Sequence, residues 1–229
     1  MDKYYPTIEE SFLFNEIDKK SIDHLLKCLG AELKNYDKDE YLFLTGDKIN
    51  NIGIVVEGIV EIIKESLAGD RHIIAFLEAS DMFAEGIVST INKISPVTAR
   101  VQANSKVLWI PYDKIIRACG NVCDFHLILI QNMITILGEK NVILNKKIEL
   151  LTLKGMRAKI AKHLLNESYD KGKQTFQIVL NRLELADYLN VSRTSMCREL
   201  SRMKEDGVID YYGKSFKILK EEELIKCLD

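Results

Sequence analysis

The chain has 229 residues, a formal net charge of −2, and a composition that is 47% hydrophobic and 29% charged, which is ordinary for a globular protein with a buried core. No apolar run approaches the roughly 20 residues of a membrane span, and Met1 begins a charged, tyrosine-rich segment unlike a signal peptide. We therefore expect a cytoplasmic protein with no membrane partner.

Charge is distributed unevenly along the chain. Residues 151–229 carry 15 Lys+Arg and 12 Asp+Glu, whereas residues 1–150 carry 17 and 22. A modestly basic C-terminal part on an acidic body is typical of a DNA-binding module attached to another domain. The odd number of cysteines suits free thiols in a reducing compartment: Cys28, Cys119, Cys123, Cys197 and Cys227.

The first half of the chain predicts helices followed by a β domain. Residues 7–34 carry apolar side chains at helical spacing. From Tyr36 to Pro111, short β-branched runs alternate with turn residues: YLFL, IGIVVEGIVEII, RHIIAFL, TARVQA and KVLWIP. This pattern predicts an all-β sandwich or barrel, and Gly58 inside a strand pattern indicates a bulge or a sharp corner.

Residues 121–151 contain no proline and predict one long helix with two apolar stripes. The first stripe has the heptad spacing of a two-stranded coiled coil, in which Asn141, its only polar member, fixes the register. We call it the dimer seam: Leu127, Ile130, Ile134, Leu137, Asn141, Leu144, Ile148 and Leu151. The second stripe is predicted to pack against the β domain: Phe125, Leu129, Met133, Ile136, Ile143 and Leu150. The alternative is a helix buried inside a monomer.

The stretch NRLELADYLNVSRTSMCRELSRMKEDGVI contains two short helical patterns on either side of a tight turn. The first helix begins at Asn181, for which Glu184 is a capping-box partner. We expect it to bury Leu183, Ala186 and Leu189 on one face. The segment Asn-Val-Ser that follows breaks the helix, because asparagine tolerates a left-handed conformation.

The second helix of this stretch has one apolar and one basic face. Ser192 is placed to cap it, and Met196, Leu200 and Met203 form its inward face. Its other face carries Arg193, Thr194, Arg198 and Arg202. Such a pair predicts a helix-turn-helix whose second helix enters the DNA major groove. The alternative is an ordinary helical hairpin with a solvated basic face.

The whole chain is therefore predicted to be an α+β protein. Residues 1–118 form a β-rich sensing domain with N-terminal helices, residues 119–151 form a dimerisation helix, and residues 152–229 form a winged helix-turn-helix domain. The wing is the hairpin predicted by GVIDYYGKSFKIL, which turns at Gly213 and Lys214.

Three blocks, LTGDKINNIGIVVEGIVEII, GDRHIIAFLEASDMFAE and VTARVQANSKVLWIP, resemble the effector domain of the CRP/FNR transcription-regulator family in order and spacing. The resemblance continues through the long helix and the helix-turn-helix, from roughly Phe12 to Leu219. It implies a double-stranded β-helix (jelly-roll) sensor, a homodimer on an inverted-repeat operator in double-stranded DNA, and control by a small-molecule effector. It also implies RNA polymerase as a further partner.

The resemblance breaks down at the family's phosphate site. In the cyclic-nucleotide-binding members a Gly-Glu and an Arg-Ser pair hold the phosphate; here the first pair reads Ala-Glu and ends at Glu85, and the second reads Val97-Thr98. A buried phosphate without its arginine would cost several kcal/mol, so we expect an effector other than cyclic AMP. The resemblance places it near these residues and near Leu144 and Asn145 on the long helix.

The resemblance also implies roles in DNA binding. Arg193, Thr194 and Arg198 occupy base-reading positions, while Asn181 and Ser192 occupy phosphate-contacting ones. Both arginines are suited to bidentate contact with guanine. The well-known members carry a glutamate where this chain has Thr194, so their operator sequence does not transfer.

Other chemistries are disfavoured, and we expect no cofactor, no metal and no enzymatic activity. Iron–sulfur sensors need about four thiolates, but only Cys28 precedes residue 119. Cys119 and Cys123 are spaced for a redox or metal-binding pair, with two buried core residues as the simpler alternative. The histidines lie in four separate segments, so they predict no metal-dependent active site: His24, His72, His126 and His163. The second candidate function is a ligand-binding regulatory module that acts through protein contacts.

Overall fold

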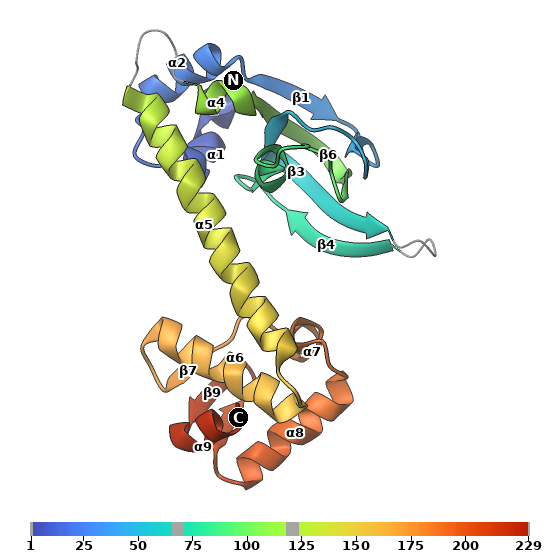
Figure 1. Ribbon diagram of the computed structural model, residues 1–229, viewed down its shortest axis with the longest axis vertical. Helices are drawn as coiled ribbons and strands as arrows, with labels where there is room; N and C mark the ends of the chain where they lie inside the picture. Colours follow the sequence, from blue (N-terminus) through green and yellow to red (C-terminus); the bar gives the residue numbers. More distant parts are fainter. Residues whose placement is uncertain (1, 66–70, 118–123, 229) are drawn as a thin grey trace. The chain divides into compact units, whose positions relative to one another are not determined.

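The computed structural model describes residues 2–65, 71–117 and 124–228. Two compact units make up the chain, Met1–Lys140 and Asn141–Asp229 (Figure 1). The prediction of an α+β chain with a β-rich first half, a long helix and a C-terminal winged helix-turn-helix is confirmed. The finer domain limits at residues 118 and 151 stay predictions, and Cys119 and Cys123 lie outside the described residues.

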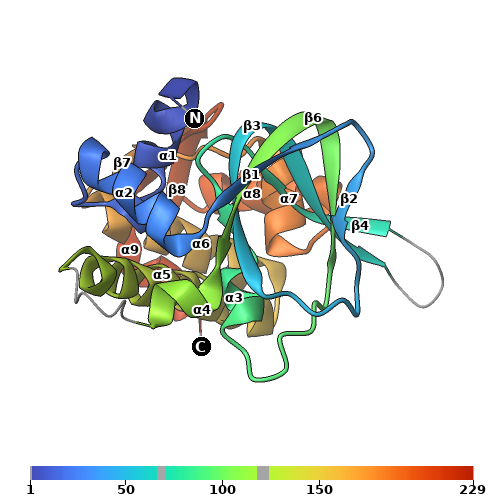
Figure 2. The same ribbon diagram turned by 90° about the horizontal axis from the view of Figure 1, so that it is seen from above.

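An antiparallel sheet frames the first unit (Figure 2). Its strands are β1 (Glu32–Tyr36), β2 (Tyr41–Phe43), β3 (Asn51–Glu65), β4 (Arg71–Leu77), β5 (Met82–Phe83) and β6 (Thr98–Pro111). The order is β1-β6-β3-β4, with β2 also paired to β6 and β5 to β3. β3 and β6 pair from Asn51 opposite Pro111 to Ile63 opposite Thr98, so the predicted runs TARVQA and KVLWIP form one strand.

Strand β3 bends at Gly58, where the backbone φ is +93°. The register with β6 shifts on both sides of this residue, from Glu57 to Ile59. A Cβ at Gly58 would lie 2.1 Å from the Ser105 Oγ and 2.5 Å from the Asn104 carbonyl oxygen. The predicted bulge is therefore confirmed, and both its conformation and its surroundings require glycine.

The N-terminal helical segment begins and ends earlier than predicted and is divided into short helices. It consists of η1 (Asp2–Tyr4), α1 (Tyr5–Glu10), η2 (Phe12–Phe14) and α2 (Lys19–Leu29). Gly30 ends α2 in the left-handed conformation, with φ +65°. β1 then begins at Glu32, so the expectation that helical structure continues to residue 34 is wrong. Two short helices complete this unit: α3 (Glu85–Val88) and α4 (Tyr112–Ile116).

The long helix α5 (Asp124–Thr152) contributes to two cores. Leu129 and Met133 are buried with the β domain, whereas Leu150 is buried in the core of the second unit. Ile143 is 62% exposed. The prediction that the second stripe packs against the β domain as a whole is wrong, because that unit ends at Lys140. The remaining members of that stripe are half-buried on the first core: Phe125 and Ile136.

The second unit contains α6 (Met156–Lys171), β7 (Thr175–Gln177), α7 (Arg182–Leu189), α8 (Arg193–Glu205), β8 (Ile209–Tyr212), β9 (Ser215–Ile218) and α9 (Glu221–Lys226). The β8–β9 hairpin turns at Gly213 and Lys214, as predicted for the wing. On α7, Leu185 is buried in place of Leu183, which is 55% exposed. That expectation was wrong because the buried face of α7 is formed by Leu185, Ala186 and Leu189. Leu183 lies in the first turn, at the edge of this face.

Replacing Gly58 with alanine is expected to lower the free energy of unfolding by roughly 2–4 kcal/mol, since backbone strain and overlap with Ser105 both oppose a methyl group. Urea unfolding of the full chain measures the change. Gly138→Ala is the matched control, because no atom beyond its own turn of helix backbone lies within 4 Å of its added Cβ and its φ is ordinary. Equal midpoints for the two variants would contradict the prediction.

Candidate functional site

The helix-turn-helix begins with a complete capping box at Asn181. Its side-chain oxygen accepts hydrogen bonds from the backbone N–H groups of Leu183 and Glu184, at 2.9 and 3.0 Å. The Glu184 carboxylate in turn accepts from the Asn181 N–H at 2.6 Å, which confirms the predicted pair. α7 ends at Asn190 with φ +52°, and Ser192 stands at the N-cap of α8 without a side-chain capping bond. This geometry fixes where the second helix starts.

Helix α8 presents an uncommitted polar face to solvent. Arg193, Thr194 and Arg198 are exposed, and none of their side chains makes a hydrogen bond or ion pair with the described part of the chain. The opposite face is held in the core, as predicted, by Met196, Leu200 and Met203. A free guanidinium offers five N–H donors in a fixed fork, so this face can bind acceptors such as base edges and phosphates.

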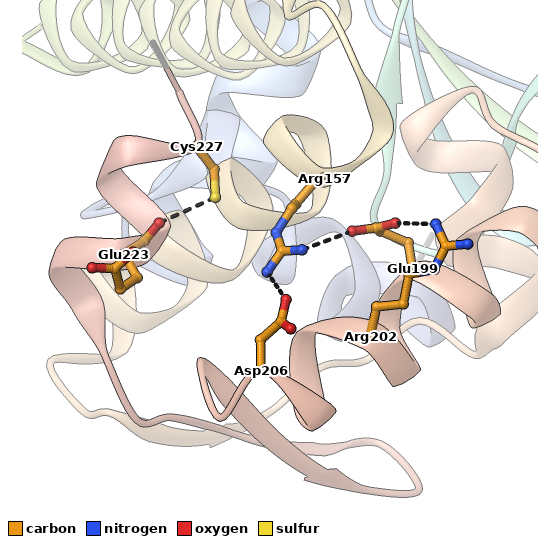
Figure 3. A network of polar contacts seen from close by, with 6 residues as sticks. All are labelled: Arg157, Glu199, Arg202, Asp206, Glu223 and Cys227. Carbon is orange, nitrogen blue, oxygen red and sulfur yellow. Dashed lines mark hydrogen bonds and ion pairs between the residues drawn. The ribbon is translucent and has the colours of Figure 1, made fainter.

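Arg157 of α6 supports α8 through two carboxylates, one on the helix and one just after its end (Figure 3). Its guanidinium lies 3.3 Å from the Glu199 carboxylate and 2.5 Å from that of Asp206. Glu199 also lies 3.5 Å from Arg202, which is otherwise largely exposed. The bond to Asp206 raises the pKa of Arg157, so the charge of this support is permanent. Sequence reasoning missed Arg157 because its partners lie more than forty residues away.

Arg182 joins α7 to the wing and is engaged inside the fold. Its guanidinium lies 5.1 Å from the centroid of the Tyr211 ring and 4.7 Å from that of Phe216. It also donates a hydrogen bond to the Gly213 carbonyl oxygen at 2.9 Å. Burial lowers its pKa. Arg182 is thus a structural cation, unlike the free arginines of α8.

Two lysines hold the C-terminal end of α7, where the helix dipole favours positive charge. Lys147 of α5 donates to the Tyr188 carbonyl, and its Nζ lies 3.7 Å from the centroid of the Tyr188 ring. Lys159 Nζ lies 3.4 Å from the Leu189 carbonyl oxygen. Next to them His163 is buried, with its ring 5.3 Å from that of Tyr188 and its Nε2 without a partner in the described chain. Burial lowers the pKa of both Lys147 and His163.

A second candidate site is a cavity of about 470 Å³ in the first unit. Its described walls are mainly apolar, and the charged residues among them are Glu85 and Lys140. Glu85 Oε1 lies 2.5 Å from Lys140 Nζ, which also lies 3.4 Å from the Met82 carbonyl oxygen. Glu85 Oε2 is buried without a hydrogen-bond partner in the described chain. The cavity therefore contains one half-satisfied buried carboxylate.

The turn before Glu85 keeps a glycine-like shape without a glycine. Ala84 has φ +67°, a left-handed conformation that costs a residue with a Cβ about 1–2 kcal/mol. Its methyl group also hinders the close backbone approach that a phosphate needs. No arginine is found among the described residues of the cavity wall. A phosphate would therefore meet a carboxylate here without a bidentate cation.

The cavity brings together only part of the predicted effector site. Glu85 and Val97 line it, whereas the buried Thr98 accepts a hydrogen bond from the Thr45 N–H at 3.1 Å and is not among the lining residues. Sequence reasoning missed Lys140. The available signal was its place one turn before Leu144, on the same side of the helix.

The remaining predicted residues lie on the second half of α5. Leu144 is exposed, and Asn145 donates a hydrogen bond to the Asn141 side chain at 2.6 Å. Both belong to the second unit. Most of the apolar dimer-seam residues are exposed: Leu127, Ile134, Leu144, Ile148 and Leu151. Two are half-buried: Ile130 and Leu137. The seam and the effector site stay predictions.

Comparison with known proteins gives matches over both units. A family model for the cyclic nucleotide-binding domain matches residues 33–121, and one for the Crp-like helix-turn-helix domain matches residues 158–227. The transcriptional activator protein anr of Pseudomonas aeruginosa is 26% identical, covering 90% of this chain and 83% of that protein. The fumarate and nitrate reduction regulatory protein of Yersinia pestis is 22% identical, covering 93% and 83%.

Solved structures show the same fold. The catabolite activator protein of Thermus thermophilus aligns with a TM-score of 0.55 and 20% identity, covering 95% of this chain and 98% of that one. A CooA variant of Carboxydothermus hydrogenoformans aligns with a TM-score of 0.60 and 18% identity, covering 96% and 97%. At these identities the likeness concerns the architecture alone.

His163 is expected to make stability depend on pH. Because burial lowers its pKa in the folded chain, the unfolded chain takes up a proton first, below about pH 6.5. The free energy of unfolding should therefore fall as the pH drops, by at most about 1.4 kcal/mol per pH unit for this one proton. Denaturant titrations between pH 7.5 and 5.5 should show a shallower dependence for His163→Leu, but not for the exposed control His24→Leu. An unchanged slope in His163→Leu would refute this role.

Proposed function

The chain belongs to the CRP/FNR family of transcriptional regulators, and from this premise we propose how it reads its operator and what controls it. It is a DNA-binding transcriptional regulator and not an enzyme; regulators of this family bind DNA and act as dimers. The observation that carries the proposal is the exposed α8 face, on which Arg193, Thr194 and Arg198 keep all their donors free.

Helix α8 is proposed to lie in the major groove with its first two turns against the bases. Arg193 and Arg198 would each make a bidentate contact with a guanine. Thr194, with a single hydroxyl, discriminates less and leaves its base position open. Asn181 and Ser192 would contact phosphates, which set the position of the helix but carry no direct sequence information.

A homodimer through the dimer seam of α5 is proposed to present two copies of α8 to the same DNA face. Two such helices about 34 Å apart meet successive major grooves, so the operator is an inverted repeat. Support comes from the seam itself, because most of its apolar residues are exposed in the described chain. Burial of such a stripe against a second copy is favourable.

By length and composition alone, the same helix between Phe125 and Thr152 could also cross a membrane. The polar contacts of this helix within the chain argue against such a span. Asn132 donates to the carbonyl oxygens of Leu13 and Asn15, at 3.0 and 2.9 Å. Lys146 pairs with Asp170 at 3.1 Å. A helix that makes such polar contacts along its length is typical of a water-soluble protein. We therefore propose that this regulator is cytoplasmic.

The proposed effector is a small molecule other than cyclic AMP, held in the cavity of the first unit. Glu85 and Val97 would form the barrel side of its site. The roles of Thr98, Leu144 and Asn145 rest on the resemblance alone. The argument is electrostatic: a phosphate would lie near the buried Glu85 carboxylate, and Lys140, the cation among the described lining residues, is already paired with that carboxylate. RNA polymerase is the proposed protein partner at the promoter.

Arg198→Ala is expected to weaken operator binding by about 1–3 kcal/mol and to relax one base position. Arg198→Lys keeps the charge but loses the bidentate fork, so it should lose specificity while retaining more of the non-specific affinity. Ser192→Ala should weaken all duplexes alike. The measurement is a gel-shift titration at fixed salt with duplexes selected by the wild-type protein from a random pool. An Arg198→Ala variant that binds as tightly and as selectively as wild type would exclude this assignment.

Ile134→Glu is expected to raise the dimer dissociation constant at least about 30-fold, because two carboxylates would face each other in an apolar seam. Val142→Glu is the matched control: the two side chains are 64% and 55% exposed on the same helix, but Val142 lies off the seam. Sedimentation equilibrium measures both. If the two variants dimerise equally well, the seam is not the interface.

A further inference from the structure

We propose that the cavity of the first unit takes a molecule with an apolar body and a cationic, N–H-donating head group, such as an amine or an amidine. The head group would bind the Glu85 carboxylate in place of Lys140. This inference rests on the proposed role of the cavity as the effector site, and it names the chemical class of the effector.

The unequal burial of the ion pair decides the sign of the ligand's charge. The Glu85 side chain is 8% exposed, whereas that of Lys140 is 49% exposed. A buried carboxylate must keep a cationic partner, but a half-exposed ammonium that loses its partner is hydrated by water. A ligand cation can therefore displace Lys140 at little cost. A ligand anion that captured Lys140 would leave Glu85 buried and unpaired.

The spare oxygen of Glu85 indicates more than one donor on the head group. Lys140 Nζ binds Oε1, at 2.5 Å, while Oε2 has no partner in the described chain. An ionised carboxylate has about four acceptor sites, so this one is under-used. An ammonium carries three N–H donors, and an amidinium presents two in one plane. Either group can satisfy both oxygens, which the tethered Lys140 does not.

The rest of the wall specifies the body of the ligand. The described lining includes Phe43, Ile62, Leu77, Met82, Ile87 and Val97, all apolar. A volume of about 470 Å³ lies within the range of small-molecule sites, roughly 300–1,000 Å³. A phosphate or carboxylate ligand gains nothing from such a wall, whereas an aryl or alkyl group is desolvated favourably. The site thus fits an amphiphilic cation.

Displacement of Lys140 would also release the links that α5 makes to two other elements of the first unit. Lys140 lies on α5, and its Nζ reaches Glu85 at the start of α3 and the Met82 carbonyl on β5. A ligand that replaces the ammonium frees α5 from this link. Recognition of the head group and release of the helix would then be a single event.

The test uses the full chain and three probes of matched shape: benzylammonium, benzyl alcohol and benzoate, with cyclic AMP as a fourth. Affinities are measured by ligand-observed NMR titration at neutral pH. We expect benzylammonium to bind most tightly, by roughly tenfold or more over benzyl alcohol, as for a hydrogen bond to a charged group. Benzoate should bind weakest of the three. No binding by any probe, or tightest binding by benzoate or cyclic AMP, would overturn the proposal.

Variants then locate the site. Glu85→Gln should remove the preference for benzylammonium, with at least a tenfold loss, and leave benzyl alcohol nearly unchanged. Lys140→Met should raise the affinity for benzylammonium, since the competing cation is gone. The control is Glu57→Gln, which breaks an exposed pair with Lys106 at 3.0 Å elsewhere in the unit. Equal losses in Glu85→Gln and Glu57→Gln would place the bound amine outside the cavity and refute the proposal.

A parallel gel-shift titration separates this inference from the proposed function. Salt-dependent DNA binding without amine binding would refute the ligand class and leave the regulator intact. Amine binding at Glu85 without DNA binding would refute the proposed operator reading and leave the ligand class standing.

Discussion

Helix α5 is the constraint on which the rest of the structure depends, because one run of chain must satisfy several surroundings at once. Leu129 and Met133 complete the core of the first unit, and Leu150 completes that of the second. Most apolar residues of the dimer seam lie outside both cores and are exposed in the described chain, although Leu137 packs partly against the first core. Exposed stripes of this kind are unfavourable in water, and the proposed dimer would bury this one against the same stripe of a second copy. The two cores and the proposed dimer therefore all depend on the same helix.

Some arginines of the second unit are engaged inside the fold and others are not, and the second group marks the proposed DNA-binding face. Arg157 is held between two carboxylates and Arg182 lies between aromatic rings of the wing, so their donors are engaged inside the fold. Arg193 and Arg198 have no such partners in the described chain. The modest net positive charge of residues 151–229 therefore understates the positive potential at the exposed face of α8. There, Arg193 and Arg198 have no carboxylate partner in the described chain.

Features that depend on neighbouring residues could be predicted from the sequence, and those that depend on tertiary approach could not. The Asn181–Glu184 capping box and the bend at Gly58 follow from local rules of conformation and hydrogen bonding. The Arg157–Glu199 and Glu85–Lys140 pairs join residues 42 and 55 positions apart, and no spacing rule predicts them. Leu183 was misplaced for a related reason: periodicity gives a face, but only packing decides which neighbouring face is buried.

The turn at Ala84 separates the shape of a site from its chemistry. Ala84 has a left-handed backbone although its Cβ makes this conformation strained. The surrounding fold must therefore hold the turn independently of any ligand. The charge around this turn is set by the buried Glu85 carboxylate, which is paired with Lys140 of α5. The ligand that such a site accepts is decided by which partner can leave. Glu85 is too deeply buried to remain without a cationic partner. The exchangeable member of the pair is therefore Lys140, which is carried by α5, the helix that both cores share.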